Sequence, residues 1–165
     1  MTPDNALVLL ATLGAPPRLV RHHELVLEAA RLICDRLTGV GFVHEQVLAG
    51  AALHDAGKIL HPEELAVPGN RHEPAGRDLL LANGVPADIA RFCVTHAAWA
   101  DGAIEDLLVA LADTLWKGKR NDALEQLVVA RIAAASGAEP WAVFDRFDAL
   151  CEDIAAGGPD RLARS

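Results

Sequence analysis

The chain carries a histidine–aspartate pair at the end of an unusually apolar stretch. Residues 47–53 are all apolar or very small, and they lead directly into His54 and Asp55. Burying an imidazole and a carboxylate without partners is costly, because both groups lose their hydration. A fold that buries this stretch must therefore supply the pair with partners, and a metal ion offsets the desolvation most readily. The pair predicts that other parts of the chain bring further ligands to it.

The composition favours packed helices over a sheet. Hydrophobic residues make up 52% of the chain, but aromatic residues make up only 4%. Alanine and leucine therefore fill the core, and few segments alternate between apolar and polar residues. We expect an all-α fold, a single-domain bundle of about seven helices. Residues 18–120 would form its core, 121–156 would pack on that core, and 157–165 would be a frayed tail.

Start and stop signals predict where the helices lie. Proline, asparagine and aspartate suit the first turns, and glycine suits the ends. Between two of the helices, residues 59–71 are expected to form a polar loop. Asn70, Asp101 and Asn121 are the expected N-caps of the third, fifth and sixth helices. The expected helices are 18–37, 43–56, 71–82, 86–96, 103–116, 122–135 and 140–155.

Charge and cysteine content narrow the possible partners. The formal net charge is −8, which disfavours a nucleic acid polymer as partner. A small anionic substrate is compatible with this charge, because bound divalent metals reverse the local field. Cys34, Cys93 and Cys151 are far apart and are expected to be buried, reduced thiols, which fits a cytoplasmic protein. No apolar run approaches the roughly 20 residues that span a bilayer, so no membrane contact is expected.

The first long helix offers one candidate ligand, and a later helix offers another. His22 falls inside the apolar stripe of the helix 18–37, and its neighbour His23 falls at the margin of that stripe. His22 is the preferred candidate and His23 the alternative. Asp113 lies in an apolar helix segment, residues 107–116. A buried ion pair with Arg or Lys is the other explanation for it, but metal coordination is the stronger interpretation.

The remaining histidines separate into two kinds. His72 stands at a helix start and His96 at a helix end. Taken singly, each could be a capping or surface histidine. His44 and His61 lie at a helix start and in a loop rich in proline and glutamate, and we expect both to be exposed.

The ordered set of candidates resembles the HD-domain superfamily of metal-dependent phosphohydrolases. The resemblance rests on a helical histidine with apolar residues four and eight positions later, on the motif His-Asp-Ala-Gly-Lys at 54–58, and on the late Ala112-Asp113. It extends over about 18–120, and it implies an HD domain whose ligand roles fall on His22, His54, Asp55 and Asp113.

Two further elements are similar to those of HD proteins with two metals. They are His-Glu-Pro-Ala-Gly at 72–76 and Phe-Cys-Val-Thr-His at 92–96. The whole order is similar to small bacterial HD hydrolases that split diadenosine tetraphosphate. Those hydrolases also carry an arginine shortly after the last aspartate, as Arg120 follows Asp113 here. The chain differs from them at 97–99, Ala-Ala-Trp, where they have a turn similar to Thr-Thr-Gly.

The resemblance implies a dinuclear centre with six ligands. Two ions about 3.5–4 Å apart could hold a shared hydroxide and clamp a phosphate between them. Imidazole ligands favour Fe, Mn, Co, Ni or Zn over Mg, and the absence of cysteine argues against a structural zinc site. The implied ligands are His22, His54 and Asp113 for the first ion, His72 and His96 for the second, and Asp55 for both.

Phosphate recognition needs positive charge beyond the metals. Lys58 directly follows the His-Asp motif, and it joins Asp55 as a candidate catalytic residue. Lys117, Lys119 and Arg120 form the one dense basic cluster. Lys58, Lys117 and Arg120 are the candidate phosphate-binding residues. The alternative for these cations is that they compensate the dipole of a helix C-terminus.

The tryptophans are also assigned from their neighbours. Trp99 follows His96 closely, and it could stack on a base or form a wall of the pocket. Trp116 and Trp141 are expected in the core.

The expected function is hydrolysis of a phosphate ester or anhydride in a small nucleotide-like substrate by a dinuclear metal-activated hydroxide. A mixed-valent di-iron oxygenase of the same fold is the alternative. Those oxygenases carry longer insertions before the last aspartate, whereas sixteen residues separate His96 from Asp113 here. A metal- or nucleotide-binding sensor without turnover is a third possibility. Because the family often dimerises, a homodimer is also possible.

Overall fold

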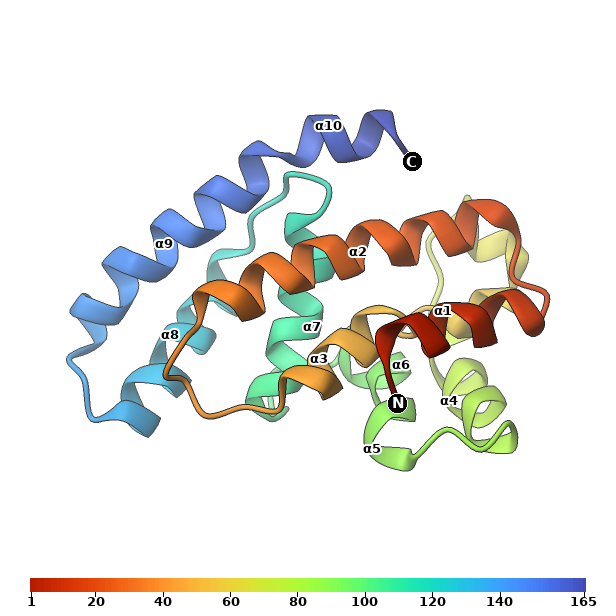
Figure 1. Cartoon of the computed structure of the whole chain (residues 1–165), viewed down its shortest axis with the longest axis horizontal. Coiled ribbons are helices and arrows are strands. Elements are labelled where there is room, and N and C mark those ends of the chain that lie inside the picture. Colours follow the sequence, from red (N-terminus) through yellow and green to blue (C-terminus); the bar gives the residue numbers. More distant parts are fainter.

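The computed structural model describes residues 1–165, and it contains helices and no strand (Figure 1). The all-α expectation is therefore confirmed. Seven of the helices have eight or more residues, close to the expected number. The α-helices are α1 Pro3–Thr12, α2 Pro17–Arg36, α3 His44–Ala51, α4 His72–Ala82, α5 Ala87–Ala90, α6 Phe92–Thr95, α7 Ile104–Leu115, α8 Asp122–Ser136, α9 Pro140–Ala156 and α10 Gly158–Ala163. Two 3-10 helices, η1 Ala56–Ile59 and η2 Pro62–Leu65, lie between α3 and α4.

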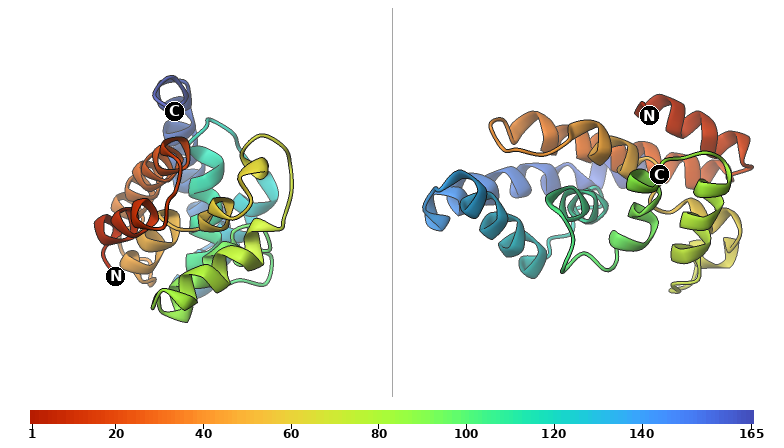
Figure 2. Two further views of the ribbon diagram at one scale, coloured as in Figure 1. Left: turned by 90° about the vertical axis from the view of Figure 1, so that its right-hand side faces the viewer. Right: turned by 90° about the horizontal axis from the view of Figure 1, so that it is seen from below.

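Three helices that contact one another form the centre of the molecule. They are α2, α3 and α7, and one buried apolar cluster extends through them from Ala6 in α1 to Ile154 in α9. α8 and α9 cover one end of this centre, whereas α4, α5 and α6 cover the other (Figures 1 and 2). Two of these helices, α2 and α7, and the turns that follow α3 each contribute part of the candidate site.

The helix that precedes His54 and Asp55 is shorter than the sequence predicts. α3 ends at Ala51, and the pair lies in the turns between it and η1. Beyond Ala51 the backbone tightens, because Leu53 donates to the Gly50 carbonyl and Ala56 donates to the Leu53 carbonyl. Such i→i+3 bonds replace α-helical ones at helix ends. The prediction of a continuous helix 43–56 was therefore wrong, although the burial of the pair was correct.

The expected caps have mixed outcomes. Asn121 caps α8 as predicted, since its side chain accepts a hydrogen bond from the Leu124 amide. Asn70 does not cap α4. The Glu64 carboxylate accepts the amide hydrogens of Arg71 and His72 instead, each at 3.1 Å. Because Glu64 lies six residues before Asn70, this cap depends on the loop fold and has no local sequence signal.

Two other boundaries also differ from the expectation. Asp101 does not cap α7; Ala103 occupies the cap position, and its amide donates to the Asp106 carboxylate at 2.9 Å. The expected helix 86–96 is divided into α5 and α6 around Arg91. The expected loop 59–71 contains η2.

The C-terminal segment is ordered rather than frayed. It forms α10, which continues from α9 past the middle of α2 (Figure 1). Arg161 is buried, and its guanidinium donates to the carbonyl oxygens of Trp116 at 2.8 Å and Leu115 at 3.3 Å. The expectation of a tail missed this helix because these contacts join residues 45 and 46 positions apart.

The predictions for the cysteines are confirmed, whereas one of those for the tryptophans is wrong. Cys34, Cys93 and Cys151 are free and buried, as predicted. Trp116 is buried as expected, but Trp141 is 72% exposed and is not a core residue. None of the helices combines the length and the apolar character needed to cross a membrane.

Candidate metal centre

Six side chains from separate parts of the fold meet at the end of α3. His54 and Asp55 are buried there, and both are reached by His22 from α2. The six form two groups whose nitrogen and oxygen atoms lie within 4.8 Å of one another in each group. The groups are His22, His54 and Asp113, and Asp55, His72 and His96. They are the same six residues that are predicted as ligands from the sequence.

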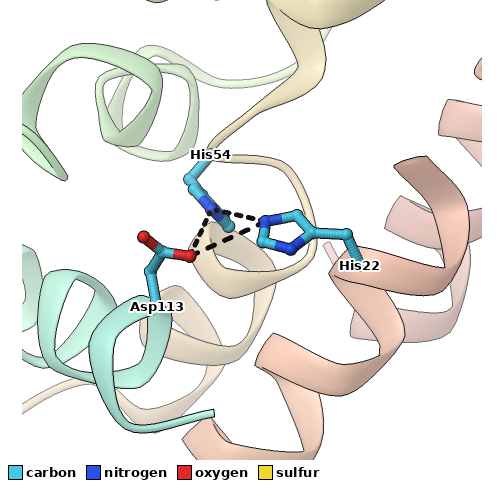
Figure 3. Close-up of side chains that lie close together, drawn as sticks. All are labelled: His22, His54 and Asp113. Atoms are coloured by element: carbon cyan, nitrogen blue, oxygen red, sulfur yellow. Dashed lines mark hydrogen bonds and ion pairs between the residues drawn. The ribbon is translucent and has the colours of Figure 1, made fainter. Parts of the chain in front are cut away.

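The first group lies between α2, the end of α3 and α7 (Figure 3). His22 Nε2 is 3.3 Å from His54 Nε2 and 3.7 Å from Asp113 Oδ1. His54 Nε2 is 3.6 Å from the same oxygen of Asp113. All three side chains thus direct one donor atom toward a common point.

Asp55 faces both groups with different oxygens. Its Oδ1 lies 3.0 Å from His72 Nε2 and 3.7 Å from His96 Nε2. Its Oδ2 lies 3.3 Å from His22 Nε2 and 3.7 Å from His54 Nε2. A carboxylate with one oxygen toward each donor group has the orientation that a bridging ligand needs.

Hydrogen bonds behind three of the imidazoles set the tautomer that binds metal. Each ring places Nδ1 against an oxygen, which can only accept, so that Nδ1 carries the hydrogen and Nε2 keeps a lone pair toward the site. Histidine ligands of metals usually have this support. The three pairs are His54 with the Ala51 carbonyl at 3.1 Å, His72 with the Glu64 carboxylate at 2.5 Å, and His96 with the Phe92 carbonyl at 2.9 Å.

Three buried side-chain atoms lack a hydrogen-bond partner. One is His23 Nε2, and the other two belong to the donor groups: Asp55 Oδ1 and His72 Nε2, which lie 3.0 Å apart without hydrogen-bond geometry. Two facing lone pairs repel each other, and buried polar atoms rarely stay unpaired. A cation between them would satisfy both. The donor set of four imidazoles and two carboxylates therefore fits divalent transition metals.

The protonation states of Asp55, Asp113 and His96 suit cation binding, although, against the effect of burial, the neighbouring carboxylates raise the pKa values of His54 and His72. Burial raises the pKa of Asp55, but its interactions with His54, His22, His72 and Lys58 outweigh this and hold the pKa well below its ordinary value. The pKa of Asp113 is lowered in the same way, because its interactions with His54 outweigh burial. Burial lowers the pKa of His96 to about 4. Both carboxylates are therefore charged and His96 is neutral near pH 7.

The two adjacent histidines of α2 point in different directions. Successive residues of a helix diverge by about 100°. His22 points into the first donor group, whereas His23 is fully buried behind it and places Nδ1 3.1 Å from the Ala51 carbonyl. His22 thus remains the preferred ligand, and His23 supports the same carbonyl that orients His54.

Two glycines join the motifs that carry Asp55 and His72. A Cβ atom on Gly57 would overlap the His72 carbonyl oxygen and lie 2.6 Å from the Gly76 amide nitrogen. Only glycine permits this backbone approach between η1 and α4. The close approach positions Asp55 beside His72.

Of the three basic residues predicted to bind phosphate, two lie at the site and one lies elsewhere. Lys58 Nζ lies 2.5 Å from Asp55 Oδ2, and Lys117 Nζ lies 3.5 Å from Asp113 Oδ2, so both are at the site. Arg120 is not brought there. Its guanidinium pairs with the carboxylates of Glu125 and Asp148 at 2.6 Å each.

The tryptophan at the site is Trp116 rather than Trp99. Trp99 packs against the apolar core and does not line the cavity beside the donor groups. Trp116 lines that cavity, its ring lies 5.2 Å from the His22 ring between centroids, and its Nε1 donates to Asp113 Oδ1 at 3.2 Å. The spacing of three residues between Asp113 and Trp116 was a usable signal, because such residues share a helix face.

Other residues at the site had no clear sequence signal. Glu64 orients His72 from a loop, and Arg18 lines the cavity one helical turn before His22. His44 and His61 lie outside both donor groups; His44 is exposed as expected, but His61 is only partly exposed. His44 stacks on Phe42 instead.

The fold and the donor groups together define a class, the helical proteins that hold metal ions with histidine and aspartate. Within this class the chain belongs to the HD-domain superfamily of metal-dependent phosphohydrolases. The family model described as HD domain matches residues 19–135, which include all six donor residues. No match was found among curated proteins or among solved structures.

Proposed function

We propose that this protein hydrolyses a phosphate ester or anhydride of a small nucleotide-like molecule, with two divalent transition-metal ions. The observation that carries the proposal is the orientation of Asp55, whose two oxygens face different donor groups. One ion would be held by His22, His54 and Asp113, and the other by His72 and His96, with Asp55 shared. When bound, such a pair of ions polarises the phosphate and lowers the pKa of water.

The chain's own side chains would complete the site around the substrate. Lys58 lies on the cavity wall beside Asp55, so its ammonium can also meet a phosphate oxygen. Lys117 lies beside Asp113 and over the Trp116 ring, at 6.0 Å from the ring centroid. These cations offset substrate charge in a protein whose net charge is −8. Hydrolysis would break one P–O bond, with the water oxygen bonding to phosphorus and a proton passing to the leaving oxygen.

The metal content of the purified protein tests the proposal directly. Aerobic and anaerobic preparations should each contain close to two transition-metal ions per chain. His22→Gln should lose metal, whereas His44→Gln, which changes a histidine outside both donor groups, should retain it. If neither preparation holds metal, the proposal is wrong.

The reaction itself needs a separate assay. With added Mn or Co, the protein should release phosphate from at least one member of a nucleotide panel. The same donor set would also suit a mixed-valent di-iron oxygenase or a sensor without turnover. Oxygen consumption by iron-loaded, partly reduced protein, without phosphate release, would identify an oxygenase. Metal binding with neither reaction would identify a sensor.

A further inference from the structure

We infer that the site selects a phosphate monoester with one compact alcohol group, at most a single nucleoside, and that Arg18 and α10 make this selection. The inference rests on the proposed function, and it names the substrate class and the residues that recognise it. It excludes as preferred substrates the long dinucleoside polyphosphates suggested by the sequence resemblance.

The cavity beside the donor groups is small. Its volume is about 220 Å³. Pockets that enclose drug-sized ligands measure roughly 300–1,000 Å³. One phosphate and a compact group would fill such a space, whereas two nucleosides joined by several phosphates would not fit within it.

The first turn of α2 and the C-terminal segment of the chain contribute to the cavity wall. Arg18 belongs to the first turn of α2, and Leu162 and Ser165 come from α10 and the residues after it. These three residues lie outside the matched HD region, 19–135, whereas the metal donors lie inside it. This part of the wall thus comes from residues beyond the matched HD region, next to donors that lie within it.

Arg18 is the cation of the wall that is free to bind an anion. It precedes His22 by four residues on α2, so both side chains lie on the same helix face. Lys58 and Lys117 are paired with site carboxylates, but Arg18 has no hydrogen bond or ion pair within the chain. A guanidinium can bind phosphate through two parallel hydrogen bonds. Arg18 therefore suits the phosphate oxygens that face away from the metals.

The position of α10 is determined by close backbone contact. A Cβ atom on Gly158 would come within 2.9 Å of the Lys117 carbonyl carbon and would overlap Gly118. Gly118 itself has a φ of 76°, which favours glycine. These two glycines let the start of α10 lie against the turn that follows α7.

Polar contacts then attach α10 to α2. The Arg164 guanidinium lies 2.9 Å from a Glu28 carboxylate oxygen, and Arg21 Nε donates to the Arg164 carbonyl at 2.7 Å. Leu162 is held at the cavity beside Trp116 as a result. Its side chain and that of Trp116 form an apolar wall that limits the size of the alcohol group.

Substrate selectivity of the metal-loaded protein tests the inference. We expect kcat/KM for p-nitrophenyl phosphate or adenosine monophosphate to exceed that for diadenosine tetraphosphate at least tenfold. Leu162→Ala should reduce the ratio of the two kcat/KM values, because it widens the cavity. Leu81→Ala, which changes an exposed leucine on α4, should leave the ratio unchanged. Equal or higher activity on diadenosine tetraphosphate would overturn the inference.

Binding of inorganic phosphate, measured by calorimetry, gives a readout independent of turnover. Arg18→Ala should weaken it about tenfold while the metal content stays constant. The matched control is Arg31→Ala, which removes another exposed arginine of α2. Unchanged phosphate affinity in Arg18→Ala would refute the role of Arg18. Arg18-dependent phosphate binding without hydrolysis of any phosphate compound would refute the proposed hydrolase and its monoester selectivity, but would leave Arg18 as an anion-binding residue.

Discussion

Gly57 and Gly76 are in backbone contact: a Cβ atom on Gly76 would lie 2.7 Å from the amide nitrogen of Gly57. Each glycine belongs to a motif that supplies metal donors, so their contact links the two halves of the site. Asp55 directly precedes η1 and His72 is the first residue of α4, so the contact between the two elements holds both residues close together.

Replacing Gly57 with alanine should therefore damage both stability and metal binding. The added methyl group must displace the backbone of α4. Overpacking of this kind lowers the free energy of unfolding by up to about 3 kcal/mol. Chemical denaturation and metal analysis would measure the two effects. Gly41→Ala is the control, because nothing lies within 4 Å of a Cβ atom there. A Gly57→Ala protein with normal stability and full metal content would contradict the importance of this contact.

Glu64→Gln should weaken metal binding while the fold is retained. Burial raises the pKa of Glu64, but hydrogen bonds from His72 outweigh this and leave the pKa below its ordinary value, so the carboxylate is charged. The neutral amide would hold the His72 ring less firmly. Loss of such a supporting hydrogen bond typically weakens metal affinity roughly 10–100-fold. Metal titration would detect this, and Glu63→Gln, an exposed neighbour, should bind metal normally.

Asp55→Asn and Asp113→Asn should differ in metal stoichiometry. Asp55 faces both donor groups, whereas Asp113 belongs to one. We expect Asp55→Asn to lose most of both ions and Asp113→Asn to lose mainly one. Metal analysis of the purified variants would distinguish them, with Asp35→Asn, an exposed carboxylate on α2, as the control. Equal losses in the two variants would argue against a shared Asp55.

His96 should make the metal-free protein less stable in acid. Its pKa is about 4 in the folded protein and 6.5 when unperturbed, because burial disfavours the charged form. The unfolded chain therefore binds the proton first, and stability rises with pH between about 4 and 6.5. The contribution is on the order of 3 kcal/mol. It is fully present above this range and is lost as the pH falls through it.

Denaturation in the presence of a chelator, at several pH values, would measure this effect. The stability of His96→Asn should depend less on pH across the same range than that of the unmodified protein. Identical pH dependence in both proteins would contradict the assignment of a neutral, buried His96.

Arg161→Met should loosen the C-terminal helix. The Arg161 guanidinium donates to carbonyls of the last turn of α7 and of Ile154. Hydrogen bonds to charged groups contribute about 1.5–3 kcal/mol, and buried carbonyls would be left unpaired. We expect a loss of about 2 kcal/mol in the free energy of unfolding. Arg146→Met, at an exposed arginine of α9, should change stability little.

Part of the candidate metal centre could be predicted from local sequence because some donors stand out against their neighbours. His54 and Asp55 follow a run of small apolar residues, and Asp113 interrupts an apolar helix. A polar residue in such a setting indicates burial, and burial requires a partner. His22 is in a donor group, as predicted, but the periodicity misjudged the burial of the two histidines, because His23 is fully buried and His22 is only partly buried.

Other features depended on contacts between distant segments. Glu64 reaches His72 from a loop, and Arg120 is held by Glu125 and Asp148 rather than by the site. Residues 158–163 form α10 rather than a frayed tail. Arg161 donates a hydrogen bond at the end of α7, and Gly158 packs against the turn after α7. Periodicity describes a helix only against its own neighbours, so it carries no information about these pairings.

Local patterns of the sequence were enough to predict a helical chain and to mark His54, Asp55 and Asp113 as buried polar residues in need of partners, whereas His72 and His96 joined the candidate ligands only through the family resemblance. The tertiary structure alone decided how these residues meet. It turned the two oxygens of Asp55 toward different donor groups, and it placed Arg18 and Leu162 on one small cavity. Such arrangements follow from backbone contacts such as Gly57 with Gly76 and Gly118 with Gly158, which exist only once the helices have packed.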